Sequence, residues 1–552
     1  MPRAWRWILK TCEFTARDGT GRAGRLRIDD SEYLLPWAGD VPSLFPALTE
    51  RKLDAFFPSD DPEFVKKFFT SDGKQPIRLH IHHPEEVTSG DAVITPNWHT
   101  LIQQPRDFVR HLQILKERIP PDTCWYFPGG VLPENAAILV HAGFDLFDFT
   151  GVDLKAVQGR FCLPDGDYPE TVMAEGLCQC PGCKAGDLRE HNRNALKQEL
   201  ALIRTRIKAG TFREFLEGRV RTRPPYVSIM RHLDRSALME NHTPVTRSTP
   251  FIAATGDSIH RPEVKRFAER LLTRYIPPLT DVAVLLPCSA RKPYSLSQSH
   301  HKFTQAISRR AHELILTSPL GLVPRDVELV YPAAHYDVPV TGYWDHEERF
   351  QIADTLAKYL MKHQYRRVIA HLDGDALLIA TDAADQAGIT LESTCSTHPT
   401  DPVALRQLSE ALSGEKKVKN HLLRGLVSMQ FGYDLRVPGL EVKGSYPEVI
   451  VKKGRQQIFS LEPSTGMLRP TFDGWSMIDT GYRVYIDDFV PQGDILAPGV
   501  VEADPAVREG DEILVIGENA MATGRAVMSA DEMIRSHRGV AVRVRKVKKL
   551  NG

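Results

Sequence analysis

Apolar and polar residues alternate along the first part of the chain in a way that predicts short strands followed by helices. AVIT at 92–95, CWYF at 124–127 and FDLFDF at 144–149 are short apolar runs of the kind that buried strands contain. Between and beside them, residues 106–119 and 135–143 carry apolar positions at helical spacing. Strands that alternate with helices favour a parallel α/β layout, either a barrel or a doubly wound sheet.

The same alternation returns between residues 281 and 375. The pattern predicts strands at 281–289, 326–334 and 365–375, and helices at 303–316 and 349–363. Polar residues follow each of the three strands, as Pro287-Cys288-Ser289, Tyr331-Pro332 and Asp373-Gly374-Asp375. Because catalytic groups in such sheets lie at the carboxyl ends of the strands, the sequence predicts an active site at this edge.

From about residue 430 the pattern changes to short strands separated by Gly and Pro turns. The last segment predicts five or six short strands and one short helix near 530–537, which together make a compact β-barrel. We therefore expect a multidomain α/β protein with a terminal barrel. The expected parts are a first α/β domain at 1–240, a linker at 241–278, a second α/β core domain at 279–425, a small connecting α+β domain at 426–475 and the barrel at 476–552.

Length and charge narrow the class of protein. A chain of 552 residues is too long for one hydrophobic core. The 70 basic and 70 acidic side chains cancel, which argues against a general polyanion binder but permits local basic faces at Arg204–Arg223 and Arg543–Lys549. No stretch reaches the roughly 18–20 apolar residues that a membrane helix needs, and the N-terminus has no signal-peptide pattern. We expect a cytoplasmic protein without a membrane partner.

Three of the eight cysteines crowd into six residues. Cys178, Cys180 and Cys183 are followed by His191, and three thiolates with one imidazole suit a closed, structural zinc site. His232 and His242 are alternatives for the fourth ligand. The next residues, 188–218, are helical with Gly210 in the middle. Most of the other cysteines are expected to be buried small hydrophobes; they are Cys12, Cys124, Cys162, Cys288 and Cys395.

Parts of the first 235 residues resemble tRNA-guanine transglycosylases. The similar segments are FTARDGTGRAGRL at 14–26, GFDLFD at 143–148, the cysteine cluster with His191-Asn192, and IKAGTFREFLEGR at 207–219. The resemblance implies a TIM-like barrel, tRNA as partner, and zinc bound by the three cysteines and His191. Asp148 matches the family's nucleophile. The family's early acidic motif is missing, although Asp91 lies nearby, and the segment is short for a full barrel. We therefore expect a reduced barrel, with Asp148 either catalytic or a structural carboxylate.

A dense group of reactive side chains follows the strand predicted at 281–289. Cys288 lies near Lys292 and ahead of a helix, an arrangement that lowers a thiol pKa, and His300 is placed to move protons. The segment at 331–345 adds His335 and Asp337 as further catalytic candidates. The candidate substrate-binding residues are Ser289, Tyr294, Ser297, Ser299, Asp373 and Asp375. We expect this cluster to be the catalytic centre rather than a helix cap beside a core cysteine.

This unit resembles the core domain of the archaeosine synthase family, in PCSARKPYSLSQSH at 287–300, in residues 317–345 and in HLDGD at 371–375. The resemblance implies addition of an amine nitrogen to the nitrile of 7-cyano-7-deazaguanine at position 15 of archaeal tRNA. It implies lysine, glutamine or ammonia as donor, of which we favour lysine, and a radical S-adenosylmethionine partner that completes the product.

One hypothesis for the chemistry has the Cys288 thiolate attack the nitrile carbon to give a thioimidate, which the amine then displaces. Asp337 or His335 would deprotonate the incoming ammonium, and Asp373 or Asp375 would bind a cationic donor. Direct attack by the amine is the alternative mechanism. An active transglycosylase and a non-catalytic tRNA-binding scaffold are the alternative functions, and the oligomeric state stays open between a monomer and a homodimer.

The terminal barrel resembles PUA domains, which dock on structured RNA chiefly through shape and backbone contacts. In a chain without net charge, its last strand is the expected tRNA contact. The basic residues of that strand are Arg543, Arg545, Lys546, Lys548 and Lys549.

Overall fold

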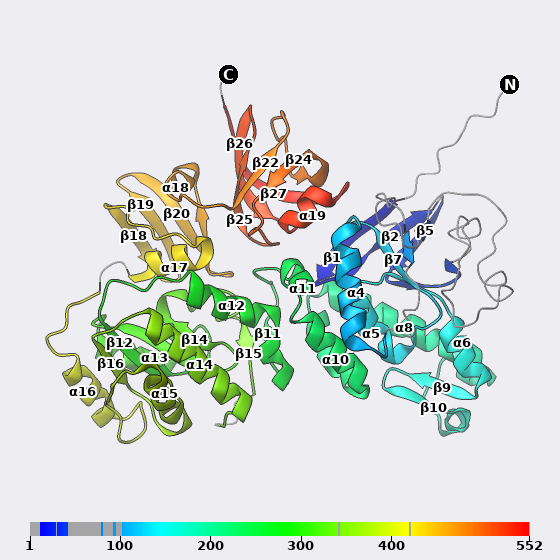
Figure 1. Ribbon diagram of the computed structural model, residues 1–552, viewed down its shortest axis with the longest axis horizontal. Coiled ribbons are helices and arrows are strands. Elements are labelled where there is room, and N and C mark those ends of the chain that lie inside the picture. The colour runs from blue at the N-terminus through cyan, green and yellow to red at the C-terminus, as the bar shows by residue number, and fades with distance from the viewer. Residues whose placement is uncertain are drawn as a thin grey trace. The chain divides into compact units, whose positions relative to one another are not determined.

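The computed structural model describes residues 11–28, 30–41, 79–80, 92–94, 102–339, 343–418 and 421–550. The chain forms two compact units, whose elements are labelled in Figure 1. The first unit comprises Met1–Thr243, Asp494–Val501 and Met528–Val542, and the second comprises Pro244–Gly493, Glu502–Val527 and Arg543–Gly552. None of the helices in the described residues is long and apolar enough to cross a membrane.

The first unit contains an antiparallel sheet of order β1-β2-β3 and a parallel sheet of order β4-β8-β7-β6-β5. The strands expected at 92–95, 124–127 and 144–149 are confirmed, and residues 14–26 lie in the antiparallel pair β1 and β2. A closed TIM-like barrel is not shown, because the parallel sheet has five strands within the described residues. The strands are β1 (Thr11–Asp18), β2 (Gly21–Ile28), β3 (Ser31–Leu35), β4 (Trp37–Ala38), β5 (Leu79–His80), β6 (Ala92–Ile94), β7 (Cys124–Phe127) and β8 (Leu146–Phe147).

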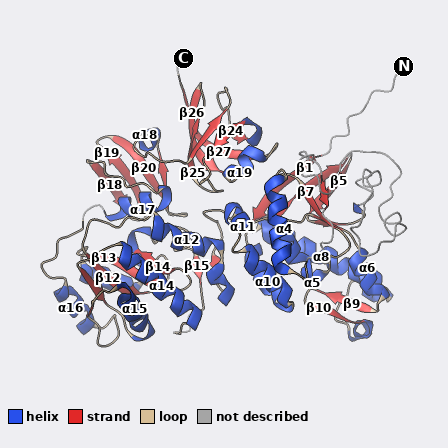
Figure 2. Ribbon diagram, viewed as in Figure 1, coloured by secondary structure: helices blue, strands red, loops and turns tan. Residues whose placement is uncertain are grey.

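Helices pack against this parallel sheet (Figure 2). The helices expected at 106–119, 135–143 and 188–218 are confirmed, the last one interrupted at Gly210, whose φ of +64° suits glycine. The elements are α4 (Pro105–Arg118), α5 (Pro133–His141), α6 (Thr150–Val157), the hairpin β9 (Arg160–Leu163) and β10 (Gly166–Pro169), α7 (Pro181–Ala185), α8 (Leu188–Lys208), α9 (Phe212–Arg219), α10 (Pro224–Leu233) and α11 (Ala237–His242).

The second unit is built on a five-stranded sheet of order β14-β13-β12-β16-β17. All neighbours pair in parallel except β13 and β14, which pair antiparallel. The chain leaves central β12 toward β13 on one side and returns to β16 on the other. The carboxyl ends of β12 and β16 therefore flank a topological switch point, where α/β sheets open a crevice for ligands.

The elements of this core are β11 (Phe251–Ile252), α12 (Pro262–Thr273), β12 (Val282–Pro287), α13 (Gln298–Ile307), β13 (His312–Thr317), β14 (Gly321–Pro324), β15 (Tyr336–Asp337), α14 (His346–Lys362), β16 (Arg367–Ala370), α15 (Gly374–Ala387), β17 (Leu391–Ser393) and α16 (Pro402–Ala411). The segment 241–278, expected to be a linker, thus contains β11 and α12.

Two of the predicted elements are wrong. Residues 303–316 are not one helix, since α13 ends at Ile307 and the fully buried strand β13 begins at His312. Ser308 and Arg309, with φ of 49° and 60°, break the helix between them. Residues 326–334 are not a strand but a 3₁₀ turn, Arg325–Val327, followed by further turns. Tyr331-Pro332 therefore does not lie at a strand end.

The rest of the chain is mostly β-structure, as expected. After α17 (His421–Phe431), an antiparallel sheet contains β18 (Leu440–Ser445), β19 (Glu448–Lys453), β20 (Gln456–Glu462) and β21 (Met467–Pro470), and α18 (Phe472–Trp475) follows. The six-stranded terminal sheet has the order β23-β27-β26-β25-β22-β24. It confirms the predicted barrel of six strands and one short helix. Its elements are β22 (Arg483–Ile486), β23 (Ile495–Leu496), β24 (Val500–Ala503), β25 (Glu512–Ile516), β26 (Ala520–Ala526), α19 (Ala530–Arg535) and β27 (Val540–Lys549).

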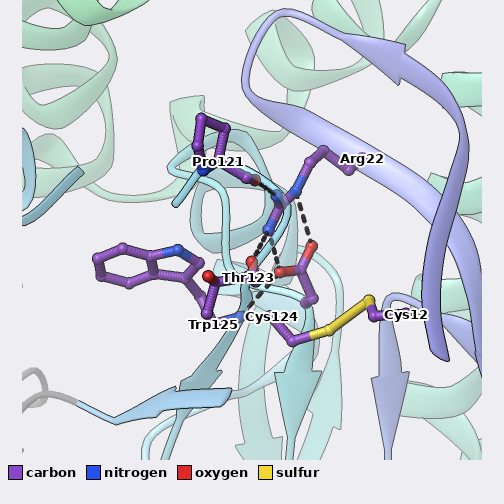
Figure 3. Close-up of a disulfide and its surroundings, with 7 residues drawn as sticks. Cys12, Arg22, Pro121, Thr123, Cys124 and Trp125 are labelled. Carbon is purple, nitrogen blue, oxygen red and sulfur yellow. Dashed lines mark hydrogen bonds and ion pairs between the residues drawn. A yellow bond between two sulfur atoms is a disulfide. The ribbon is translucent and has the colours of Figure 1, made fainter. Parts of the chain in front are cut away.

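A disulfide joins Cys12 of β1 to Cys124 of β7 (Figure 3). Both side chains are buried, but they are paired rather than free small hydrophobes, which corrects the expectation for these two cysteines. Beside them, the Arg22 guanidinium pairs with the fully buried Asp145 and also donates to the Thr123 carbonyl over 2.9 Å. Of the other cysteines, Cys162 is buried as expected, Cys395 is half-buried and Cys288 is exposed.

Candidate functional site

A pocket of about 620 Å³ opens at the carboxyl edge of the core sheet. Cys288 follows β12, and Asp373 and Asp375 lie at the start of α15, directly after β16. The switch point thus brings these three predicted residues into one cavity, as the strand-end argument expects. The other polar or aromatic residues that line it are Thr255, Ser258, Ser318, Tyr343, Trp344, Asp345 and Glu348.

The Cys288 side chain is exposed within this pocket. The surrounding protein atoms raise the pKa of its thiol, while the positive charge of Lys292 and a hydrogen bond with the Thr317 hydroxyl lower it, and the net direction is upward. This corrects the expected lowering, because the surrounding protein atoms outweigh the combined effect of Lys292 and Thr317 on the thiol pKa. Cys288 is therefore protonated at neutral pH in the free protein.

Lys292 lies next to this thiol. Its ammonium nitrogen lies 4.0 Å from the centre of the Tyr336 ring. Burial lowers the Lys292 pKa, and the nearby Cys288 and Asp337 partly raise it again. Because the pKa of the thiol rises while that of the amine falls, proton transfer between Cys288 and Lys292 comes closer to balance.

Several predicted substrate-binding residues instead build the start of α13. The Ser297 hydroxyl accepts from the His300 backbone N–H over 3.2 Å, and Ser299 lies 3.2 Å from that hydroxyl. Ser289 donates to the Arg291 carbonyl over 3.0 Å. Tyr294 is fully buried, so its hydroxyl has no direct access to a substrate. Among the described residues that line the pocket, none of these four side chains is included.

The predicted histidines also lie outside the described lining of the pocket. His300 is fully buried, and its Nδ1 accepts a hydrogen bond from Arg325 over 2.5 Å. Burial and the Arg325 charge lower the His300 pKa to about 2, so the ring stays neutral at physiological pH. Burial also lowers the pKa of His335. Asp337, the exposed residue of β15, lies near Lys292 and is outside the lining as well.

The structure adds residues that the sequence did not single out. Thr317 ends β13, whose register pairs Leu316 with Pro287, so Thr317 lies beside Cys288, and its hydroxyl lowers the pKa of the thiol. Glu348 lines the pocket, where the Ser318 hydroxyl donates to one carboxylate oxygen and the Asp345 backbone N–H to the other. Trp344 offers a flat ring in the same wall. The neighbouring strand end was the signal for Thr317, but the wrong helix at 303–316 concealed it.

A second site lies in the first unit, where Cys178, Cys180, Cys183 and His191 place four ligand atoms within 4.8 Å of one another. His191 Nδ1 lies 3.5 Å from Cys180 Sγ and 3.2 Å from Cys183 Sγ, which confirms His191 over His232 and His242 as the fourth member. Three sulfurs and one imidazole nitrogen fit a tetrahedral metal ion such as zinc.

Contacts around the four ligand residues orient this cluster. His191 Nε2 lies 3.1 Å from the Cys162 carbonyl oxygen, which fixes the ring with Nδ1 toward the sulfurs, and Phe161 stacks on the ring at 3.6 Å. Gly182 in α7 lies so close to the His191 backbone that a Cβ would be 2.3 Å from its nitrogen. Helices α7 and α8 can therefore approach each other this closely only because residue 182 is a glycine.

Asp148 lies at the end of β8 and is buried. Its carboxylate accepts three hydrogen bonds, from the Tyr126 hydroxyl over 2.7 Å and from the backbone N–H groups of Gly129 and Thr150 over 2.8 and 2.7 Å. Such a set of donors is what a structural carboxylate at a strand end requires. Asp91, which lies near the position of the missing acidic motif in the sequence, is outside the described residues.

The basic residues of β27 are exposed. Arg543, Lys546, Lys548 and Lys549 present their charges to solvent, whereas Arg545 donates to both carboxylate oxygens of buried Glu512 over 2.7 Å. Four of the five predicted RNA contacts are thus available to a polyanion.

Two family models match the chain. A domain of unknown function, DUF5591, matches residues 264–412, and the PUA domain matches residues 482–548. With the fold, these matches define a multidomain α/β protein that carries a C-terminal PUA domain.

Characterised relatives specify the family. The chain is 37% identical to the archaeosine synthase subunit alpha of Methanosarcina acetivorans, over 99% of this chain and 92% of the relative. It is 34% identical to the archaeosine synthase of Haloferax volcanii, over 97% and 99%. The tRNA-guanine(15) transglycosylase of Methanobrevibacter smithii is 25% identical, over 84% and 73%. The chain belongs to the archaeosine synthase family of tRNA-modifying enzymes.

Proposed function

We propose that this enzyme adds an amine nitrogen to the nitrile of 7-cyano-7-deazaguanine at position 15 of archaeal tRNA, in archaeosine biosynthesis. The observation that carries the proposal is the Cys288 thiol in a pocket whose wall holds four carboxylates. A thiol is a nucleophile for a nitrile carbon, and a ring of carboxylates attracts a cationic amine. The four carboxylates belong to Asp345, Glu348, Asp373 and Asp375.

In the first step, the Cys288 sulfur forms a bond to the nitrile carbon. Lys292, with its lowered pKa, accepts the thiol proton, and that proton passes to the nitrile nitrogen as one π bond of the nitrile breaks. The product is a thioimidate held on Cys288. Trp344 in the pocket wall would stack on the 7-deazaguanine ring and keep the nitrile directed at the sulfur.

In the second step, the donor amine attacks the thioimidate carbon, and the carbon–sulfur bond breaks to release Cys288 and leave an amidine on the base. The atoms of the nitrile and the amine together make up the amidine, so no oxidant is needed. Asp373 and Asp375 would bind the cationic donor, although Arg349, 3.5 Å from Asp375, offsets part of that charge. Glu348 or Asp337 would take the ammonium proton. Direct attack by the amine without a thioimidate is the alternative route.

The pocket favours lysine over glutamine or ammonia as the donor. A volume of about 620 Å³ exceeds the needs of ammonia beside the base, and the excess of carboxylates favours a cation over neutral glutamine. A lysine adduct would then be the substrate of a radical S-adenosylmethionine partner that completes archaeosine. Glutamine would also require water to release its amide nitrogen.

The other parts of the chain would hold the tRNA. The PUA domain would contact tRNA through Arg543, Lys546, Lys548 and Lys549 of β27. A structural zinc ion on the Cys178 cluster would fasten α7 to α8, and the five-stranded parallel sheet would belong to a reduced TIM-like barrel. A homodimer is compatible with this assignment. Ser289, Ser297 and Ser299 would stabilise the loop after β12 and would not contact substrate. His300 would likewise have a structural role, through its hydrogen bond with Arg325.

The test is mass spectrometry of nitrile-bearing tRNA incubated with the full chain and lysine, glutamine or ammonium in separate reactions. The expected result is a lysine adduct for the unchanged protein and for Cys395→Ala, and loss of at least 100-fold in rate for Cys288→Ala, an order-of-magnitude figure for removal of a nucleophile. Full activity of Cys288→Ala would exclude the thioimidate, and adducts with ammonium alone would exclude lysine.

The order of motifs around Asp148 and the transglycosylase relative favour base exchange as a second candidate. In that case Asp148→Asn would abolish release of labelled guanine from tRNA. Because three donors already occupy the Asp148 carboxylate, we expect no release from the unchanged protein. A tRNA-binding scaffold would instead bind tRNA and yield no adduct with any donor.

A further inference from the structure

Behind the Cys288 pocket, three buried side chains form a continuous chain of hydroxyl groups. The Tyr294 hydroxyl contacts the Tyr336 hydroxyl, which in turn contacts the Thr317 hydroxyl. Thr317 follows Leu316, which pairs with Pro287, so it lies beside Cys288 on the neighbouring strand, and its hydroxyl lowers the Cys288 pKa. Each of the three hydroxyl-bearing residues is at most 4% exposed. The chain of hydroxyls therefore ends beside the sulfur at one side and inside the protein at the other.

Separate elements build this arrangement, so it does not follow from one local motif. Tyr294 begins a 3₁₀ turn, Tyr294–Leu296, after β12; Thr317 ends β13; and Tyr336 begins β15. The parallel pairing of β12 with β13 brings Thr317 beside Cys288. The Tyr336 ring is also the surface on which the Lys292 ammonium rests at 4.0 Å. Tyr336 thus contacts both the hydroxyl chain and the residue that we assign as proton acceptor.

We propose that Thr317 is a positioning residue that donates a hydrogen bond to the Cys288 thiolate, and that Tyr336 and Tyr294 hold it in the donating orientation. This inference rests on the proposed role of Cys288 as the nucleophile. A hydroxyl has one proton, and Thr317 can donate it either to Cys288 or to the Ser318 carbonyl, 3.2 Å away. Donation from the Tyr336 hydroxyl to the Thr317 oxygen leaves the Thr317 proton for the sulfur when the thiolate forms.

The pKa directions agree with this order of donors. Burial raises the pKa values of both tyrosines, so their hydroxyls stay protonated and remain donors at neutral pH. The Thr317 hydroxyl lowers the Cys288 pKa, against the upward effect of burial. Removal of that hydroxyl must therefore raise the thiol pKa further. The titratable groups around the thiol are Lys292, Tyr294, His300, Tyr336, Asp337, Asp345, Glu348, Asp373 and Asp375.

The experiment is the rate of Cys288 alkylation by iodoacetamide as a function of pH, read by mass spectrometry on the full chain. We expect Thr317→Val to raise the pH midpoint by about one unit, which means about tenfold slower alkylation at pH values below the midpoint. Thr317→Ser, which keeps the hydroxyl, should retain the original midpoint. Tyr336→Phe should raise it by less, because it releases Thr317 to donate to Ser318.

Cys395 in the same protein is the internal control, and its alkylation profile should not change in any variant. An unchanged Cys288 midpoint in Thr317→Val would overturn the inference. If that variant does not fold, the comparison of Tyr336→Phe with the unchanged protein decides: no upward shift overturns it. The result is separate from the proposed function, since alkylation needs no tRNA, and loss of activity in Cys288→Ala tests the nucleophile alone.

Discussion

Arg22→Met would remove the charge partner of a buried carboxylate in the first unit. Arg22 Nε donates to Asp145 over 3.2 Å, and Nη2 pairs with the other carboxylate oxygen and also donates to the Thr123 carbonyl over 2.9 Å. Arg22 Nη1 donates to the Pro121 carbonyl over 2.5 Å. Asp145 is fully buried, and without Arg22 it keeps the Trp125 backbone N–H, 2.9 Å away, as a donor. Breaking a buried pair in this way costs about 3–5 kcal/mol of unfolding free energy.

For a unit of this size, about 1 kcal/mol shifts the transition midpoint by about 2–4 °C, so the variant should unfold about 6–20 °C lower. The assay is calorimetry of the full chain, in which the first unit's transition is followed. Arg25→Met is the matched control on the same strand, because Arg25 and Glu32 are 48% and 38% exposed and such pairs contribute less than about 1 kcal/mol. The reasoning fails if Arg22→Met lowers the midpoint no more than Arg25→Met does.

Four further outcomes can be measured directly. Metal analysis should find about one zinc ion per chain, lost in Cys183→Ser and His191→Ala but retained in Cys162→Ser, whose carbonyl and not its thiol contacts His191. The Cys12–Cys124 disulfide joins residues 112 positions apart, which corresponds to about 4–5 kcal/mol of unfolding free energy in the chain-entropy model. Reductant should therefore destabilise the unchanged protein but not the variant with both cysteines changed to Ser. A count of eight free thiols without reductant would contradict this prediction. Burial lowers the His363 pKa to about 4, below its value in the unfolded chain, so His363 favours folding above pH ~6.5. This contribution to the free energy of unfolding is lost as the pH falls toward 4. Denaturant titrations of His363→Gln should therefore show a stability that depends less on pH in this window. Changing Lys546, Lys548 and Lys549 to Gln should weaken tRNA binding and lower the salt slope of log K by about 2–3, and an unchanged slope would place the RNA contact elsewhere.

The sequence predicted the elements whose periodicity is strong. Helix α14 and strands β12 and β16 were correct because long helical spacing and short buried apolar runs are distinct signals. Residues 303–316 failed because HELIL, at the end of the segment, is a short apolar run that fits a buried helix as well as a buried strand. The helix ends at Ser308 and Arg309, which adopt positive φ angles although neither residue type predicts a turn from the sequence.

That single error determined which site residues were missed. With β13 read as part of a helix, Thr317 was not recognised as a strand end, although it lies beside Cys288. Tyr294, Ser297 and Ser299 were predicted as substrate contacts because they are near Cys288 in sequence, and proximity in sequence does not reveal which side chains turn inward. In the structure Tyr294 is buried, and the Ser297 and Ser299 hydroxyls lie against each other. The Cys12–Cys124 disulfide is a similar case, since no local sequence pattern predicts the pairing of two cysteines 112 residues apart.

The distribution of charge suits the polyanionic tRNA and the cationic donor of the proposed function, although the chain has no net charge. Carboxylates gather at the starts of α14 and α15, around the Cys288 pocket, where they attract an ammonium group and repel phosphates. Exposed lysines and arginines gather on β27 of the PUA domain, where they attract phosphates. Under the proposed function, a pocket that repels the tRNA backbone would admit the nitrile base only as a single flipped nucleotide. Binding energy for the tRNA would then come from outside the Cys288 pocket, and the PUA domain would be required for catalysis at low tRNA concentration.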